Sequence, residues 1–257
     1  MIQDKDLDFL KTCSHQELDN LVHLLIYDKD QKKRVSQSLS KNKLYKKHAP
    51  NHAHYTDAII SEIQRYGGNT IANILRGGKG VLYREILEDV CRLYKIQYNK
   101  TIETEALEEL LLLNILEHSL EKMNEAQRKE LLHTLGVETT SFSNKAILSA
   151  VQIAFRANGF TSYKLSVVVA NSIIRQLTGK GIAFVGNQTL TKSLSILSGP
   201  VGWAITSLWT VYDISGPAYR VTVPVVLEIA YLRKEHQIKK RSLWYRIKHL
   251  FKSPFNG

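Results

Sequence analysis

The sequence predicts an all-α protein, a multi-helix bundle with an apolar C-terminal helical hairpin and a basic amphipathic tail helix. Three observations support this fold class. Apolar residues recur at a spacing close to 3.6 along most of the 257 residues. Several of these stretches begin at capping boxes and end at glycines. An apolar fraction of 44% with 23% charged residues is typical of an ordinary globular protein and argues against a globally disordered chain.

The first helix has a clear start signal. Ser14 and Glu17 have the spacing of a capping box, in which the Ser14 hydroxyl accepts from the backbone N–H of Glu17 and the Glu17 carboxylate accepts from the backbone N–H of Ser14. Apolar residues follow at helical spacing, so we expect a helix that ends near Tyr27. A lysine-rich polar stretch and the break at Pro50 complete a small N-terminal helical unit over residues 1–50.

A neutral helical bundle is predicted over residues 51–160. Five helices are expected in it, four from apolar stripes and one from a capping box at Asn124 that is closed by Gly136. Their approximate ranges are 55–66, 82–93, 106–120, 124–136 and 146–157.

The chain then changes character, and an apolar helical hairpin is expected over residues 161–233. A run of three valines favours a strand locally, but the flanking spacing favours a helix over 165–177. Ser-Gly-Pro triplets at 198–200 and 215–217 predict breaks between short apolar helices. The uncharged stretch 193–212 is long enough to cross a membrane, yet only eleven of its twenty residues are apolar, so we favour a buried core hairpin.

The net charge of +11 lies entirely toward the C-terminus. Residues 151–257 contain fourteen Lys and Arg but three Asp and Glu, which leaves twenty-one basic and twenty-one acidic side chains for residues 1–150. Such an asymmetry indicates an anionic partner at the C-terminal end, either a lipid surface or a phosphate backbone.

The tail over residues 234–257 carries the most informative functional signal, because cationic and large apolar side chains are interleaved along it. Apolar burial combined with attraction to anionic head groups is typical of a helix that lies in a membrane interface. The residues expected to bind a membrane or a partner are Lys239, Lys240, Arg241, Trp244, Arg246, Ile247, Lys248 and Phe251. The alternative is a C-terminal helix that packs on the rest of the protein and leaves its lysines in solvent.

Two acids, Asp213 and Glu228, stand isolated in the apolar region, and Arg220 lies between them in the sequence. Desolvation raises the pKa of a buried carboxylic acid unless a cation pairs with it. We therefore expect Arg220 to form a structural ion pair with one of the two acids, in preference to a catalytic role for either acid.

The sequence gives no positive indication of an enzyme. Two glycine–lysine turns, at 77–80 and 178–181, lack both the first glycine and the hydroxyl residue of a phosphate-binding loop. His48, His52 and His54 could gather around a metal and serve a metal-dependent hydrolase, although the proline between them argues against one continuous helix. The alternative for these histidines is an exposed polar linker.

Several stretches resemble the YaaW-like family of bacterial proteins. They are 6–10, 65–77, 82–87, 199–202 and 215–224, and the resemblance covers most of residues 4–233. Part of that family is linked by name to a ubiquinol–cytochrome c chaperone-like domain, a helical bundle that assists assembly of a membrane respiratory complex. The resemblance implies a helical fold and a bacterial cytoplasmic setting, and it brings no catalytic residues with it.

We therefore expect a non-enzymatic interaction or assembly protein that docks peripherally on an anionic membrane surface through its C-terminal third. Nucleic-acid binding by the same basic surface is the alternative, although no helix-turn-helix or zinc-finger motif is evident. No cofactor and no small-molecule substrate are inferred. The first residues lack the pattern of a secretory signal, and Cys13 and Cys91 lie in or beside apolar helical patterns, where we expect reduced thiols. A cytoplasmic protein, peripheral on the inner membrane, is expected.

Overall fold

The computed structural model describes residues 2–67, 80–157, 159–178, 202, 204 and 218–250. Within these ranges, only the backbone is described for residues 174–178 and 242–250. Throughout these residues the chain is built from helices and their connections, and the described part contains no sheet, only one isolated bridge between Tyr27 and Lys33. The predicted all-α class is confirmed. Cys13 and Cys91 are both buried free thiols.

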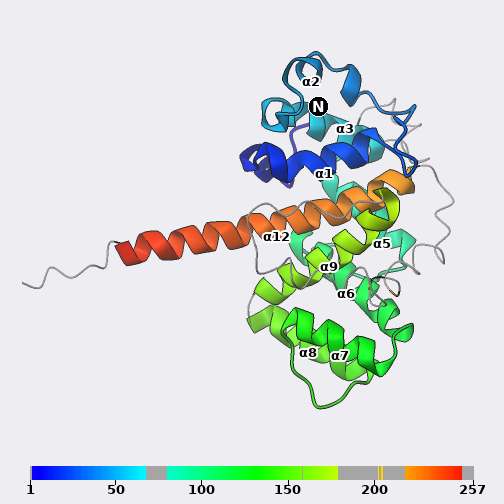
Figure 1. Cartoon of the computed structure of the whole chain (residues 1–257), viewed down its shortest axis with the longest axis vertical. Helices are drawn as coiled ribbons and strands as arrows, with labels where there is room; N and C mark the ends of the chain where they lie inside the picture. The colour runs from blue at the N-terminus through cyan, green and yellow to red at the C-terminus, as the bar shows by residue number, and fades with distance from the viewer. Residues whose placement is uncertain are drawn as a thin grey trace, which may run out of the picture.

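In the N-terminal part, two longer helices pack beside a compact cluster of short ones (Figure 1). Its elements are the 3-10 helices η1 (Asp8–Thr12), η2 (Leu39–Lys41) and η3 (His52–Tyr55) and the α-helices α1 (His15–Ile26), α2 (Lys43–His48) and α3 (Thr56–Gly67). The predicted capping box starts α1, since Ser14 Oγ accepts from Glu17 N at 3.3 Å and Glu17 Oε2 accepts from Ser14 N at 2.6 Å.

The middle of the chain forms five further helices in the predicted order. They are α5 (Tyr83–Leu93), α6 (Thr104–Glu121), α7 (Glu125–Leu135), α8 (Asn144–Ala157) and α9 (Gly159–Thr178). The capping box at Asn124 and Gln127 is present, and Gly136 ends α7 with φ at 68°, a conformation that glycine adopts without steric cost. The three valines of α9 are helical, because packing in the core overrides their local strand preference.

The last element, α12 (Tyr219–Leu250), is one continuous helix of 32 residues. The predicted apolar region and the predicted basic tail meet at residues 233 and 234, within this helix. Pro224 also lies inside the helix, where it removes one backbone hydrogen bond. All residues from 221 to 232 are buried, so packing on every side of this stretch stabilises the helix despite that loss.

Helix α12 runs through the middle of the molecule, and the other helices gather around its first half (Figure 1). Helix α9 is its most extensive neighbour, and the rings of Tyr163 and Tyr231 stack between them with centroids 6.1 Å apart. Helices α1, α5, α3 and α6 also pack against α12. Beyond Lys239, α12 extends away from the body of the protein.

The predicted apolar hairpin lies largely outside the described residues, which include only 202 and 204 between 179 and 217. Two predicted domain boundaries, at 160 and 233, fall within α9 and α12, and the division into domains stays a prediction. Among the helices that the structure describes, none combines the length and the apolar character needed to cross a membrane.

Candidate interaction surface

The candidate site lies on α12, where the helix changes from apolar to charged after Leu232. Arg233 is the first cation, and its Nε donates to Glu108 Oε2 of α6 at 2.9 Å. Its Nη2 also donates to the carbonyl oxygen of Asp6 at 2.8 Å. Tyr83 of α5 donates its hydroxyl to the other oxygen of Glu108 at 2.6 Å. The side chain of Glu108 is fully buried, so Arg233 neutralises a charge inside the protein.

Burial raises the pKa of Glu108, even though Arg233 and the Tyr83 hydrogen bond act in the opposite direction. The same ion pair raises the pKa of Arg233 against the effect of its own burial. A buried pair of this kind is costly to break, because the remaining charge has neither water nor a counter-ion around it.

The next cations of α12 are also paired. Lys234 is 4% exposed and contacts two acids of α6, Glu105 and Glu109, with the Nζ to Glu109 Oε1 distance at 2.6 Å. Lys239 donates to Glu17 Oε1 of α1 at 2.6 Å and lies 3.0 Å from Glu235 Oε1. Although burial acts to raise the pKa of Glu17, hydrogen bonds from Lys239 and Ser14 bring it below the ordinary value. These lysines therefore join α12 to α6 and α1.

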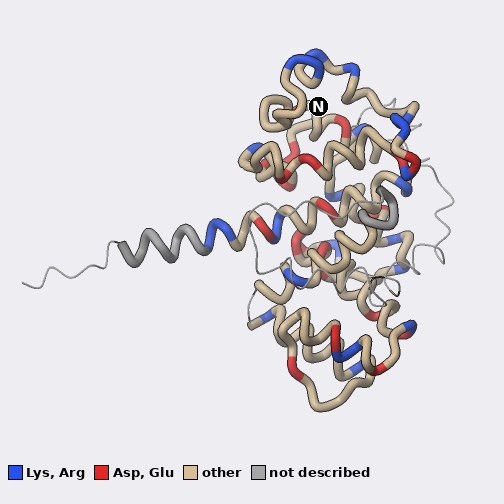
Figure 2. Tube along the Cα trace, viewed as in Figure 1, with Lys and Arg blue, Asp and Glu red and all other residues tan. Residues whose placement is uncertain are grey.

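The following turn of α12 carries two unpaired cations. Lys240 and Arg241 are exposed, and within the described residues they have no ion pair. Figure 2 shows this basic turn where α12 leaves the body of the protein. The backbone of Trp244, Arg246, Ile247 and Lys248 continues the helix, while their side chains and the whole of Phe251 lie outside the described residues.

The predicted ion pair of Arg220 with an isolated acid is not formed by Glu228. Arg220 is exposed and Glu228 is fully buried on the same helix. Eight residues of helix separate them by about 12 Å, which is too far for contact. Asp213 lies outside the described residues.

Glu228 is instead an isolated acid in the core. Neither of its carboxylate oxygens has a hydrogen-bond partner in the described structure. Burial raises the pKa of Glu228 to about 8, and the nearby Glu235 acts in the same direction, whereas Asn20 of α1 opposes the rise. A neutral, protonated side chain is therefore favoured at this position in the folded protein.

Comparison with known proteins gives a clear assignment. The chain is 44% identical over 235 residues to a UPF0174 protein of Helicobacter pylori strain J99, and the alignment covers 91% of this chain and 92% of that protein. The chain belongs to the UPF0174 family. It is also 33% identical to the UPF0174 protein YaaW of Escherichia coli K12, over 91% of this chain and 95% of YaaW. The resemblance to YaaW-like proteins is thereby confirmed.

Two family models match parts of this UPF0174 chain. A domain of unknown function, DUF3944, matches residues 1–35, and the ubiquinol-cytochrome C chaperone family matches residues 51–227, which is more than half of the chain. The chain is therefore a member of the chaperone family as well. No solved structure matches the chain at a significant level.

The three histidines considered as metal ligands, His48, His52 and His54, are divided between two environments. His52 is buried, with Nε2 at 3.0 Å from Asp19 Oδ1 of α1 and Nδ1 hydrogen-bonded to the hydroxyl of Tyr55. His48 and His54 stack on each other with ring centroids 4.8 Å apart. In the part of the chain that the structure describes, no three metal-ligating side chains are grouped to hold an ion. His52 serves to join η3 to α1.

Sequence reasoning missed the acidic partners of α12 in this UPF0174 chain. The glutamates of α6 lie in a leucine-rich helix, and their cations lie about 125 positions further along the chain. No local pattern relates positions so far apart. The paired cations are part of the framework, and the exposed turn at Lys240 and Arg241 is the part of the described site that can meet an external anion.

Proposed function

We propose that this protein is a non-enzymatic interaction or assembly protein that docks on an anionic membrane surface through the free end of α12. The observation that carries the proposal is the change along one helix. Arg233, Lys234 and Lys239 are paired with carboxylates, whereas Lys240 and Arg241 are exposed and unpaired where the helix leaves the body.

The charge of the free end supports this function. From residue 240 to the last residue, the sequence contains five Lys and Arg and no Asp or Glu. Basic residues near an anionic lipid surface each contribute about 1 kcal/mol of attraction. Trp244, Ile247 and Phe251 supply the apolar component that an interfacial helix buries.

The family name supports the broader part of the proposal. A member of a family described as a ubiquinol-cytochrome C chaperone is expected to act by binding another protein. A peripheral position on the membrane would bring this chain to partners that reside there. The wider function proposed here is therefore protein interaction, with the membrane surface as the place of action.

Vesicle flotation of the full chain tests this function. We expect flotation with vesicles that contain phosphatidylglycerol and little flotation with phosphatidylcholine alone. A variant that ends after Lys239 keeps Arg233, Lys234 and Lys239 and removes Lys240, Arg241 and the cations that follow them in the sequence, so it should stay folded and lose flotation. Equal flotation of the truncated and the full-length protein contradicts the proposal.

A matched control separates the position of the charges from their number. The tail variant replaces four cations by glutamine: Lys240→Gln, Arg241→Gln, Arg246→Gln and Lys248→Gln. The control replaces four exposed lysines elsewhere: Lys95→Gln, Lys100→Gln, Lys122→Gln and Lys145→Gln. Both variants lower the net charge equally, and only the tail variant should lose flotation.

A further inference from the structure

A second basic surface lies at the opposite end of the sequence. Residues 31–56, here called the basic knob, contain seven Lys and Arg and no Asp or Glu. The overall neutrality of residues 1–150 conceals this segment, because the acids that balance it lie elsewhere in the chain. In Figure 2 the turns of α2 carry cationic positions without acidic ones, at one end of the molecule.

The lysines of the basic knob are unpaired, unlike Lys234 and Lys239 of α12. All six are exposed, and none forms an ion pair in the described structure: Lys32, Lys33, Lys41, Lys43, Lys46 and Lys47. By contrast, Lys234 and Lys239 each contact two carboxylates. The knob therefore presents its positive charge to the surroundings.

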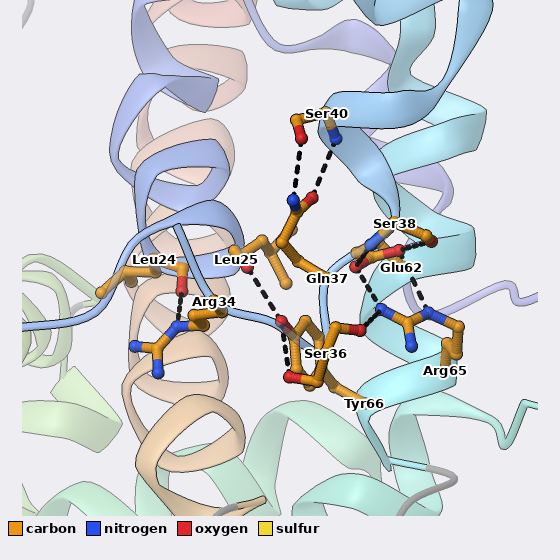
Figure 3. A network of polar contacts seen from close by, with 10 residues as sticks. All are labelled: Leu24, Leu25, Arg34, Ser36, Gln37, Ser38, Ser40, Glu62, Arg65 and Tyr66. Atoms are coloured by element: carbon orange, nitrogen blue, oxygen red, sulfur yellow. Dashed lines mark hydrogen bonds and ion pairs between the residues drawn. The ribbon is translucent and has the colours of Figure 1, made fainter. Parts of the chain in front are cut away.

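A network of polar contacts holds the start of the knob in place (Figure 3). Glu62 of α3 is 3% exposed, and it accepts from the backbone N–H of Ser38 at 2.8 Å and from Arg65 Nε at 3.2 Å. Arg65 also donates to the carbonyl oxygen of Ser36. Arg34 donates to the carbonyl oxygen of Leu24 in α1 at 3.2 Å. The segment before α2 is thereby fixed to α1 and α3.

Aromatic contacts hold the other end of the knob. The rings of Tyr45 and Tyr55 meet edge to face with centroids 5.5 Å apart, and His52 bonds both Tyr55 and Asp19. With both ends anchored, the lysines of α2 occupy a fixed part of the surface before any partner binds. A preorganised surface loses less conformational entropy on binding.

We infer that the basic knob is a second contact with the anionic lipid head groups of a membrane, and this inference rests on the proposed docking function. Two exposed apolar side chains in the knob favour a lipid surface over other polyanions as its partner. Val35 is 98% exposed and Leu44 is 47% exposed, and both lie among the lysines. Interfacial binding buries such aliphatic groups, whereas single-stranded nucleic acids are bound by aromatic stacking beside a basic groove.

Two weak contacts that act together bind more tightly than either one alone, because the second contact forms within an already bound molecule. The knob and the free end of α12 belong to different elements, and α1 lies between them in Figure 1. A protein that uses both is held at two separated points of the lipid surface.

The test is cosedimentation of the full-length protein with vesicles of phosphatidylcholine and phosphatidylglycerol. The knob variant carries Lys43→Gln, Lys46→Gln and Lys47→Gln, and the control carries Lys100→Gln, Lys122→Gln and Lys145→Gln. We expect the partition coefficient of the knob variant to fall by at least about tenfold. The control should partition like the wild type. Equal partition of the knob and control variants overturns the inference.

A second variant tests whether aliphatic burial contributes. Val35→Ser with Leu44→Ser leaves every charge in place, and we expect about a threefold or larger loss of partition, since less apolar surface enters the interface. Wild-type partition of this variant together with strong retention on immobilised DNA indicates a nucleic-acid surface and overturns the lipid assignment.

The two proposals fail in different ways. Loss of binding on truncation after Lys239, with full binding by the knob variant, retains the docking function and removes the knob. Loss of binding by the knob variant, with full binding after truncation, retains the knob and contradicts docking through α12.

Discussion

The middle of α12 and the basic knob are both rich in cations, yet the structure uses them differently. In α12, Arg233 and Lys234 are buried against the glutamates of α6. In the knob, the lysines of α2 are exposed and have no acidic partner within the described residues. The comparison teaches that a count of charges does not locate a binding surface in this protein. The absence of a nearby carboxylate locates it better, and four variants test that distinction.

Removal of Arg233 should have the largest effect. Arg233→Met leaves Glu108 fully buried without its cation, so we expect the free energy of unfolding to fall by about 3–5 kcal/mol. Urea denaturation measures the change. The double variant Arg233→Met with Glu108→Leu removes both charges and should recover much of the loss. A loss below about 1 kcal/mol in the single variant contradicts the assignment of this pair to the framework.

Glu228 sharpens the comparison because it is buried on the same helix without a cation. Its pKa is about 8 in the folded protein, against 4.5 for the ordinary side chain. The folded state therefore holds the proton more strongly, and this stabilisation is complete below the ordinary pKa and is lost as the pH rises toward about 8. The slope of the free energy of unfolding approaches about 1.4 kcal/mol per pH unit in that window.

Glu228→Gln imitates the protonated acid and should remove this slope. We expect the variant to be more stable than the wild type at pH 8 and close to it at pH 5. Urea denaturation of both proteins across that pH range measures the difference. Parallel pH profiles would show that Glu228 is not held neutral by the fold.

Lys239 lies between the two extremes. Its side chain is 49% exposed, so solvent screens its contacts with Glu17 and Glu235. Lys239→Gln should lower the free energy of unfolding by about 1 kcal/mol or less, as measured by thermal denaturation. An effect as large as that of Arg233→Met would assign Lys239 to the buried framework.

The knob should respond least. Lys43→Gln, Lys46→Gln and Lys47→Gln together remove no ion pair, and surface changes of this type each alter stability by about 0.5 kcal/mol or less. Thermal denaturation should therefore give nearly the wild-type curve, although lipid partition falls. A large loss of stability would indicate that these lysines support the fold.

The features that the sequence predicts well depend on residues close together in the chain. The capping boxes at Ser14 and Asn124 and the left-handed Gly136 each involve a few neighbours, and all three are present. The helix around Pro224 depends instead on distant residues, because burial against other helices outweighs the local cost of proline in a helix.

The candidate site shows the same limit. The sequence pointed to the end of α12, and the exposed Lys240 and Arg241 agree with a surface position. It did not reveal that Lys239 is paired with Glu17, which lies more than 200 residues earlier. The knob could have been found by counting charge in short windows, since no acid interrupts residues 31–56. Counting over 150 residues averaged it away.

The continuity of α12 has a mechanical consequence. At 1.5 Å per residue, 32 residues form a stiff rod about 48 Å long. Its first half is packed between α9 and α1, and the part beyond Lys239 extends away from the body of the protein. A partner that binds the end of α12 therefore sets the orientation of the whole protein, because a force applied there is transmitted along the helix to the centre of the fold.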